Sequence, residues 1–489
     1  MSNESSLQDG AESRRIVTPS TKGHLHILGI CGTFMGGIAA LAKALGYRVT
    51  GSDKNVYPPM STQLEKLGIA LHQDDDLTQL EPAPDQVIIG NALSRGHPLV
   101  EAVLQRRIPY ISGPQWLGET LLRQKHVLAI AGTHGKTTTA SMLTWILEQA
   151  GKSPSFLIGG VVQPFGQTAR LTDSDYFVIE ADEYDTAFFD KRSKFLHYFA
   201  DTFVVNNLEF DHADIFADLA AIQQQFKYAL RTVPQDGHVL YPIDEPAVAP
   251  VVASASWVEC QGVGPGAAWD FELNADDGSH FHIIQNGERV AQVQWSLIGV
   301  HNVRNALMAI AAAASVGVLP QVAAQALASF EAPARRLQLR GQGCGVAVFD
   351  DFAHHPTAIR TTLEAMRARV DSQRVVAIFE PRSNTMKAGV HAQTLGPAFR
   401  EADAIYALQP DGVDWPLAAQ LEASGKPVYV CASVAALVEC LFANEAPYLG
   451  AQDASIANHW VVMSNGGFGG IHDQLLNGIM ANDPVPTDG

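Results

Sequence analysis

Residues 126–138 read His-Val-Leu-Ala-Ile-Ala-Gly-Thr-His-Gly-Lys-Thr-Thr, an apolar strand that runs into a glycine loop and then into a helix-like segment. This order of elements is the context in which a phosphate-binding P-loop occurs. Glycines let backbone N–H groups turn toward phosphates, lysine adds a point charge, and a threonine hydroxyl reaches magnesium. Ile130 occupies the first glycine position of the usual GxxxxGK[ST] pattern, so this loop is tighter. We predict a triphosphate site formed by Gly132, Thr133, His134, Gly135, Lys136, Thr137 and Thr138.

A second apolar strand, residues 176–179, ends in a group of carboxylates at Glu180, Asp182, Glu183 and Asp185. Carboxylates this close raise one another's pKa, and a divalent cation relieves their repulsion. Glu180 is the first residue to leave the strand, so we predict that it binds Mg²⁺ beside the P-loop. A solvated acidic loop is the alternative interpretation.

A third strand, residues 202–205, leads to the pair Asp211-His212. His212 is a candidate ligand of a second Mg²⁺ or a contact of the γ-phosphate. An isolated histidine is as often a satisfied core or surface residue. The spacing leaves these interpretations open.

Short apolar runs alternate with longer amphipathic stretches from residue 24 onward, which is typical of β-α-β units and parallel sheets. The sequence therefore predicts an α/β fold with three domains, since the length of 489 residues exceeds one ordinary core. We place the boundaries at 23–122, 123–333 and 334–489, after a loose polar tail at 1–22. In the third domain, strands are expected at 346–349, 375–379, 404–407, 428–430 and 460–463.

Composition narrows the functional class. The formal net charge of -18 argues against a nucleic-acid partner, which requires clustered lysine and arginine. No run of 18 uncharged apolar residues is present, so we expect no membrane span and, because the polar opening lacks an apolar signal core, a cytoplasmic location. Five scattered cysteines without CxxC spacing argue against both a disulfide framework and a zinc knuckle.

A glycine-rich loop also follows the first strand, residues 24–29, with Asp53 further along. It imitates a dinucleotide-binding fingerprint, but no register yields GxGxxG. Asp53 is placed either to meet a ribose or to fix the loop. Tight packing between helix and strand is the alternative reason for the glycines.

Several separate motifs, in order along the chain, resemble those of the Mur ligase family, whose members build the peptide stem of peptidoglycan. The resemblance runs from about residue 24 to the end. Its motifs are the first glycine loop, GTHGKTT, EADE at 180–183, Asp211-His212, Gly299-Val-His301-Asn302-Val-Arg-Asn305, Arg335-Arg336, and Asp350-Asp351-Phe-Ala-His354-His355-Pro356. The fold that it implies has a Rossmann-like UDP-binding domain, a central P-loop ATPase domain and a Rossmann-like C-terminal domain.

The resemblance also implies roles for individual residues. Lys136 and the loop amides would hold ATP, and Thr137, Glu180 and His212 would bind Mg²⁺. Further ATP contacts would come from His301 and Asn305 at a helix start, from Arg336, and from Asp351 on the ribose. Lys136, His212 and Arg336 would be the catalytic set. Helix capping is the alternative role for Asn305 and Asp351.

Substrate residues follow from the same resemblance. The UDP-sugar would lie against Gly29, Gly32, Thr33, Phe34, Met35, Asp53, Asn91 and Ser94. Three stretches, 183–195, 380–387 and 463–470, resemble the member that joins L-alanyl-γ-D-glutamyl-meso-diaminopimelate to UDP-N-acetylmuramate in peptidoglycan recycling. The peptide would contact Arg382, Ser383, Asn384, Ser464 and Asn465, since Arg382 can fork onto a carboxylate.

Other functions remain alternatives at this point. The nearest is addition of L-alanine alone to UDP-N-acetylmuramate. A nucleotide-dependent oxidoreductase and a P-loop protein that only hydrolyses ATP belong to other classes. Some relatives carry a carbamylated lysine near the metals, and Lys191 and Lys194 are the lysines close to the acidic loop, but neither is matched to that role. The oligomeric state stays open.

Overall fold

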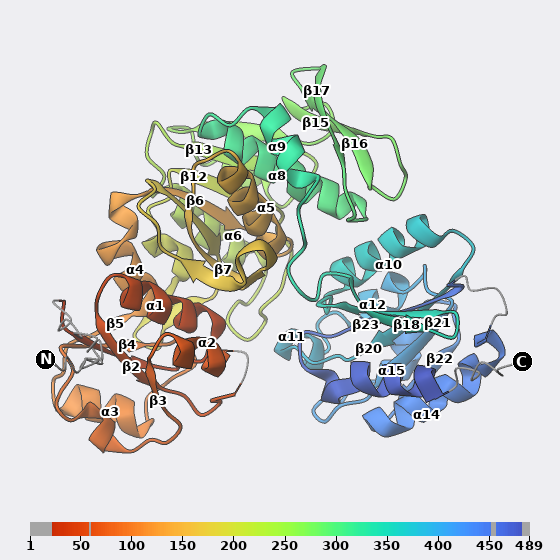
Figure 1. Ribbon diagram of the computed structural model, residues 1–489, viewed down its shortest axis with the longest axis horizontal. Coiled ribbons are helices and arrows are strands. Elements are labelled where there is room, and N and C mark those ends of the chain that lie inside the picture. The colour runs from red at the N-terminus through yellow and green to blue at the C-terminus, as the bar shows by residue number, and fades with distance from the viewer. Residues whose placement is uncertain (1–21, 58–59, 451–455, 482–489) are drawn as a thin grey trace, which may run out of the picture.

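A computed structural model describes residues 22–57, 60–450 and 456–481, which form three α/β domains. In Figure 1 the first domain lies below the middle domain, and the third lies to the right. The predicted tail therefore lies, apart from Lys22, outside the described residues. The three-domain α/β prediction is confirmed by three separate sheets of five, ten and six strands. The boundaries at 122/123 and 333/334 stay predictions, and they fall in a short 3-10 helix, η2 (Leu122–Gln124), and in the segment before β18 (Gln338–Gly343).

The first domain is a parallel five-stranded sheet in the order β3-β2-β1-β4-β5. Its elements are β1 (His24–Leu28), α1 (Thr33–Ala44), β2 (Arg48–Ser52), α2 (Met60–Lys66), β3 (Ala70–His72), η1 (Leu77–Leu80), β4 (Gln86–Ile89), α3 (Pro98–Gln105), β5 (Tyr110–Ser112) and α4 (Gly113–Thr120). Side chains of β1 alternate between two apolar clusters, so both faces of the sheet are covered. The strand order reverses between β1 and β4, and such a switch point opens a ligand crevice at the carboxyl ends.

The middle domain has a ten-stranded sheet in the order β17-β16-β15-β14-β13-β12-β6-β9-β7-β8. Its strands are β6 (His126–Ala131), β7 (Ser155–Val162), β8 (Gln167–Arg170), β9 (Tyr176–Ala181), β12 (Thr202–Val205), β13 (His238–Pro242), β14 (Glu259–Val263), β15 (Trp269–Leu273), β16 (His280–Gln285) and β17 (Glu288–Gln294). The P-loop strand β6 is parallel to β9 on one side and to β12 on the other. The acidic loop and the Asp211-His212 loop therefore flank the P-loop.

Helices cover both faces of this sheet. They are α5 (Lys136–Gln149), α6 (Leu219–Leu230), α7 (Ala249–Val252), α8 (Val300–Ser315) and α9 (Pro320–Leu327). One face buries α5, α8 and α9, and the apolar cluster on the other face continues into the first domain. At that junction a Cβ on Gly37 of α1 would lie 2.2 Å from Leu157 Cδ1 of β7, so glycine permits the close approach. A small antiparallel pair, β10 (Asp185–Ala187) and β11 (Asp190–Ser193), follows the acidic loop and leads into η4 (Lys194–His197).

The third domain is a six-stranded sheet in the order β18-β19-β23-β20-β21-β22, parallel except for the edge strand β18. Its other strands are β19 (Val346–Asp351), β20 (Arg374–Phe379), β21 (Ala404–Leu408), β22 (Val428–Cys431) and β23 (Asn458–Met463). Its helices are α10 (Pro356–Val370), α11 (Asn384–Lys387), α12 (Ala392–Ala398), α13 (Leu417–Glu422), α14 (Val434–Glu445), η5 (Ala446–Tyr448), η6 (Phe468–Gly470) and α15 (Ile471–Ala481). Each of the five predicted strands is confirmed, with ends one or two residues longer.

Candidate active site

The P-loop closes around Gly135, which caps α5 with a φ of 79°. A Cβ there would lie 2.4 Å from the Asn305 Oδ1 atom, so the loop can pass this close to α8 only with glycine. Asn305 is the sixth residue of α8, whose N-cap is Gly299. Asn305 therefore does not cap this helix, and its amide faces the P-loop.

Glu180 lies at the end of β9 against the P-loop threonine. Thr137 donates its hydroxyl to both carboxylate oxygens of Glu180, at 2.9 and 3.0 Å. The backbone N–H of Gly159 on β7 donates to the same carboxylate at 2.7 Å. Two predicted magnesium ligands, Thr137 and Glu180, are thus brought together, and an amide of the neighbouring strand fixes the carboxylate.

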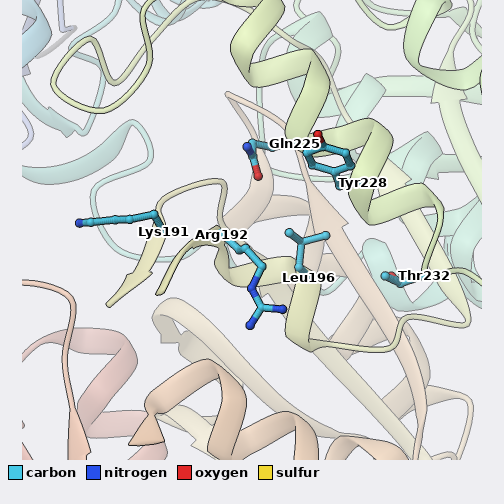
Figure 2. A pocket seen from close by; sticks show the side chains of 6 residues that line it. All are labelled: Lys191, Arg192, Leu196, Gln225, Tyr228 and Thr232. Atoms are coloured by element: carbon cyan, nitrogen blue, oxygen red, sulfur yellow. The ribbon is translucent and has the colours of Figure 1, made fainter. Parts of the chain in front are cut away.

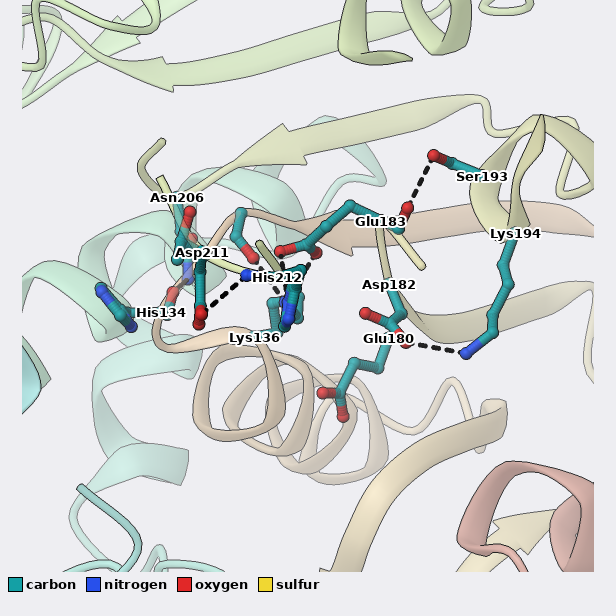
Figure 3. A network of polar contacts seen from close by, with 12 residues as sticks. His134, Lys136, Glu180, Asp182, Glu183, Ser193, Lys194, Asn206, Asp211 and His212 are labelled. Carbon is teal, nitrogen blue, oxygen red and sulfur yellow. Dashed lines mark hydrogen bonds and ion pairs between the residues drawn. The ribbon is translucent and has the colours of Figure 1, made fainter. Parts of the chain in front are cut away.

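The predicted catalytic lysine and histidine meet at one carboxylate, Glu183 (Figure 3). Lys136 Nζ lies 2.8 Å from Glu183 Oε2 and donates a second hydrogen bond to the Gly132 carbonyl. His212 Nε2 lies 3.2 Å from Glu183 Oε1. His212 has a φ of 57°, a conformation that costs energy for a residue with a Cβ and that directs its ring at the cluster.

Burial and charge act against each other in this cluster. Burial by itself would lower the pKa of the Lys136 amine, but Glu183 and Asp182 more than offset it, so that pKa is raised. Burial by itself would raise the pKa of Glu183, yet Lys136 and His212 leave it lowered. Ligand atoms of Asp182, Glu183 and His212 all lie within 4.8 Å of one another. These oxygen and nitrogen donors suit a divalent cation.

A cavity of about 750 Å³ opens beside this cluster, between the middle and third domains. Nearly all of the residues predicted for ATP and magnesium line it together: Thr133, His134, Gly135, Lys136, Thr137, Thr138, Glu180, His212, His301, Asn305, Arg336 and Asp351. Gly132 is the exception, and its carbonyl accepts a hydrogen bond from the Lys136 ammonium. The volume is that of a small-molecule pocket.

Residues of the third domain close this cavity. Arg336 lies over the Phe352 ring, 5.3 Å from its centre. Burial, with the charge of Arg336 as the second cause, lowers the pKa of His301 to about 4. His301 is therefore neutral at pH 7. Asp351 accepts hydrogen bonds from the backbone N–H groups of Leu337 and Ala353, so its carboxylate fixes the loops around it. It does not cap a helix, because the N-cap of α10 is His355.

Glu209, just after β12, joins the P-loop to the third domain. Its carboxylate lies 2.9 Å from His134 Nε2, 3.3 Å from His355 Nδ1 and 2.8 Å from the Thr357 hydroxyl, which donates to it. Burial would raise the pKa of Glu209, but the hydrogen bonds and the charge of His134 lower it to about 2. This carboxylate is a fixed contact between two domains.

In the first domain, the predicted UDP-sugar residues gather at the switch point. Gly29 follows β1 with a φ of 78°, and α1 begins directly after Gly32. Asp53 accepts from the backbone N–H of Cys31 at 3.0 Å, so it fixes the glycine loop, one of the two roles expected for it. Thr33, Phe34 and Met35 form the first turn of α1, and Asn91 and Ser94 follow the adjacent strand β4.

The predicted peptide residues lie on the third domain and do not line the ATP cavity. Ser383 caps α11, and Ser464 donates its hydroxyl to Glu380 at 2.5 Å. Arg382 packs so closely on Gly466 that a Cβ there would lie 2.0 Å from Nη1. Asn465 follows Ser464 in the same loop. Asn384 reaches the middle domain, where it donates to Asp214 at 3.4 Å, two residues beyond His212.

Sequence reasoning missed several residues of the site. Glu183 was seen only as one carboxylate of the acidic loop, and Glu209 and Thr357 received no role. Gly159 also escaped notice, since it carries no side chain. Thr357 lies 148 residues from Glu209 along the chain, and a single sequence holds no signal for such a contact.

The fold and the site together define a nucleotide-dependent P-loop enzyme with a Rossmann-like domain on either side. Family models described as Mur ligase family, catalytic domain, Mur ligase middle domain, and Mur ligase, glutamate ligase domain match residues 24–125, 130–313 and 335–448. The chain belongs to the Mur ligase family, which consists of ATP-dependent ligases. The family prediction is confirmed, and the oxidoreductase alternative finds no support.

Individual relatives are similar over most of the chain. The UDP-N-acetylmuramate--L-alanyl-gamma-D-glutamyl-meso-2,6-diaminoheptandioate ligase of Escherichia coli (strain K12) is 54% identical over 93% of this chain and 98% of its own. A crystal structure of a murein peptide ligase from Psychrobacter arcticus 273-4 is 42% identical, with a TM-score of 0.71 over 95% of this chain and 100% of that one. The UDP-N-acetylmuramate--L-alanine ligase of Salinibacter ruber (strain DSM 13855 / M31) is 35% identical over 73% of this chain and 74% of its own.

Proposed function

We propose that this Mur ligase joins L-alanyl-γ-D-glutamyl-meso-diaminopimelate to UDP-N-acetylmuramate at the expense of ATP, in peptidoglycan recycling. The observation that carries the proposal is that the P-loop cavity belongs to a middle domain whose apolar core continues into the first domain, where the predicted UDP-sugar residues gather. The similarity to the tripeptide-adding enzyme of Escherichia coli extends over 93% of the chain, which supports the same acceptor.

The proposed chemistry has two steps. The lactyl carboxylate of UDP-N-acetylmuramate attacks the γ-phosphorus of ATP, which gives an acyl phosphate and ADP. The alanine amine of the tripeptide then attacks the acyl carbon, and phosphate leaves as the amide forms. Positioning and charge neutralisation supply most of the acceleration in such phosphoryl transfers. Lys136, His212 and Arg336 are the proposed charge-bearing residues.

The cluster also fits Mg²⁺. Thr137 and Glu180, already hydrogen-bonded to each other, are the proposed ligands of one ion, and His212 beside Glu183 is proposed for a second. When bound, the ions supply charge neutralisation at the phosphate oxygens. The ammonium of Lys136 donates to Glu183 at 2.8 Å. We infer that Lys136 exchanges this carboxylate for phosphate oxygens when the nucleotide binds.

The substrate-binding roles extend to the outer domains. The amides of the loop from Gly29 to Thr33, at the start of α1, are proposed to hold the pyrophosphate of the UDP-sugar, since a helix N-terminus favours an anion. Asn91 and Ser94 assist from the end of β4. Arg382, Ser383, Asn384, Ser464 and Asn465 are proposed to contact the peptide. Within residues 22–57, 60–450 and 456–481, no helix combines the length and apolar composition that a membrane crossing requires. A cytoplasmic location remains part of the proposal.

A side-by-side assay tests the proposal. Purified enzyme is given ATP, Mg²⁺ and UDP-N-acetylmuramate with either the tripeptide or L-alanine, and the products are identified by mass. We expect kcat/KM for the tripeptide to exceed that for alanine by about a hundredfold or more, since a recognised substrate carboxylate alone contributes about 1.5–3 kcal/mol. Preference for alanine would make the chain an alanine-adding ligase. Phosphate release that is independent of the UDP-sugar would favour simple hydrolysis.

A further inference from the structure

The side chain of Lys194 is buried at the junction of the first and middle domains, between Phe34 and Asp182. Residue Lys194 is 8% exposed, and its ammonium donates one hydrogen bond, to Asp182 Oδ2 at 2.8 Å (Figure 3). The same Nζ lies 5.6 Å from the centre of the Phe34 ring and 5.5 Å from that of Tyr184. A buried ammonium is costly unless it is compensated, and its position therefore calls for an explanation.

The side chains around Lys194 belong to two different proposed substrate sites. Phe34 is the second residue of α1, at the proposed UDP-sugar crevice, whereas Asp182 lines the ATP cavity. The backbone N–H of Lys194 donates to the Tyr184 carbonyl, and Ser193 donates its hydroxyl to the Glu183 carbonyl at 2.6 Å. The hairpin β10–β11 thus holds Lys194 between Asp182 of the ATP cavity and Phe34 of the first domain.

The reaction that we propose brings two anions together at this place. A carboxylate and a triphosphate repel each other, so cations are required on both sides of the reacting atoms. Lys136 lies on the phosphate side, in the P-loop. Lys194 is the corresponding cation on the side of the sugar nucleotide. An ammonium has three N–H donors, and Asp182 engages one of them, which leaves two for a ligand.

We propose that Lys194 binds the lactyl carboxylate of the UDP-sugar and holds it in line with the γ-phosphate, an assignment that rests on the proposed function. Lys191, three residues earlier, has a different environment. Its side chain is 70% exposed, pairs with Asp185 and points away from Tyr228 and Thr232 beside an outer surface pocket (Figure 2). Lys191 is therefore a matched control, a lysine of the same hairpin that lies outside the site.

The test compares two sugar nucleotides that differ in the lactyl group. UDP-N-acetylmuramate carries the carboxylate, and UDP-N-acetylglucosamine lacks it. Binding is measured by calorimetry without ATP and Mg²⁺, for the wild type, Lys194→Met and Lys191→Met. We expect Lys194→Met to weaken the binding of UDP-N-acetylmuramate about tenfold or more, which is the effect of losing one charged hydrogen bond. UDP-N-acetylglucosamine should bind all three proteins alike, and Lys191→Met should match the wild type with both ligands.

A purely structural role predicts a different result. If Lys194 serves only to neutralise Asp182, Lys194→Met weakens the binding of both sugar nucleotides by the same factor. The double variant Lys194→Met/Asp182→Asn then regains wild-type affinity for both. Either result overturns the proposal. If Lys194 binds the carboxylate, the double variant folds but still discriminates poorly between the two ligands, and Lys194→Arg recovers part of the discrimination. A wild-type protein that does not prefer UDP-N-acetylmuramate overturns the proposed function, and this inference with it, before any variant is compared.

Discussion

The ammonium of Lys136 lies 2.8 Å from the carboxylate of Glu183, so the P-loop lysine and the acidic loop form an ion pair at the centre of the site. The two side chains are 11% and 2% exposed. Such a pair holds the P-loop side chain in place. It also means that catalysis and stability share one residue.

Lys136→Met should therefore abolish ligation and also destabilise the protein. Loss of the lysine leaves the buried Glu183 carboxylate with His212 as its remaining charged partner, and breaking a buried pair costs about 3 kcal/mol. Activity and the midpoint of thermal unfolding are the two measurements. The double variant Lys136→Met/Glu183→Gln should regain most of the stability and none of the activity. Substantial ligation by Lys136→Met would refute the role given to this lysine.

Glu180 should control the requirement for magnesium. In Glu180→Gln the neutral amide is a weaker ligand for a hard cation, so we expect the Mg²⁺ concentration for half-maximal activity to rise about tenfold or more. Gly159→Ala should shift it in the same direction, because a Cβ there would lie 2.8 Å from Glu180 Oε2. A Mg²⁺ titration of the ligation rate measures both. An unchanged titration curve in Glu180→Gln would remove this residue from the metal site.

Arg382 should affect the peptide rather than the nucleotide. Arg382→Ala removes a proposed fork onto a substrate carboxylate, so the KM for the tripeptide should rise about tenfold while that for ATP stays within about twofold. Gly466→Ala should do the same, since the new methyl group displaces the guanidinium. Gly467→Ala is the control, because a Cβ there meets nothing within 4 Å. Equal changes in both KM values would contradict peptide recognition by Arg382.

Glu209 should link stability to pH. Its pKa falls from the usual 4.5 to about 2 on folding, so its contribution is complete above pH 4.5 and is lost as the pH falls toward 2. We expect Glu209→Gln to lower the free energy of unfolding by about 1 kcal/mol at pH 7. The value is modest because a third of the Glu209 side chain is exposed. Urea unfolding at pH 7, 5, 3 and 2 should show this difference in unfolding free energy shrink only below pH 4.5. A difference that persists at pH 2 would contradict the contact, and exposed Glu288→Gln should show none.

The parallel core of each domain follows from the sequence, because buried parallel strands are short apolar runs that end in polar residues. The antiparallel additions were not foreseen. One of them had a signal, since Asn286-Gly287 between β16 and β17 is a dipeptide typical of hairpin turns, and both residues have positive φ. The edge strand β18 had no comparable signal.

The site divides in the same way. Thr137, Glu180 and His212 are predictable because motifs at the ends of neighbouring parallel strands meet at one edge of a sheet. The roles of Glu209 and Lys194 depend on domain packing and on a hairpin that turns one lysine inward and another outward. The alternation of polar and apolar residues along the chain does not reveal which of the two lysines points inward. The structure distinguishes the buried Lys194 from the exposed Lys191.

We propose that the lactyl carboxylate of UDP-N-acetylmuramate receives the γ-phosphoryl group of ATP. Isotope transfer tests it directly: UDP-N-acetylmuramate labelled with ¹⁸O in both carboxylate oxygens is ligated to the tripeptide, and the released phosphate is analysed by mass spectrometry. We expect one ¹⁸O atom in each released phosphate and one in the new amide. Phosphate without label would contradict it, since the carboxylate would then never have been bonded to phosphorus.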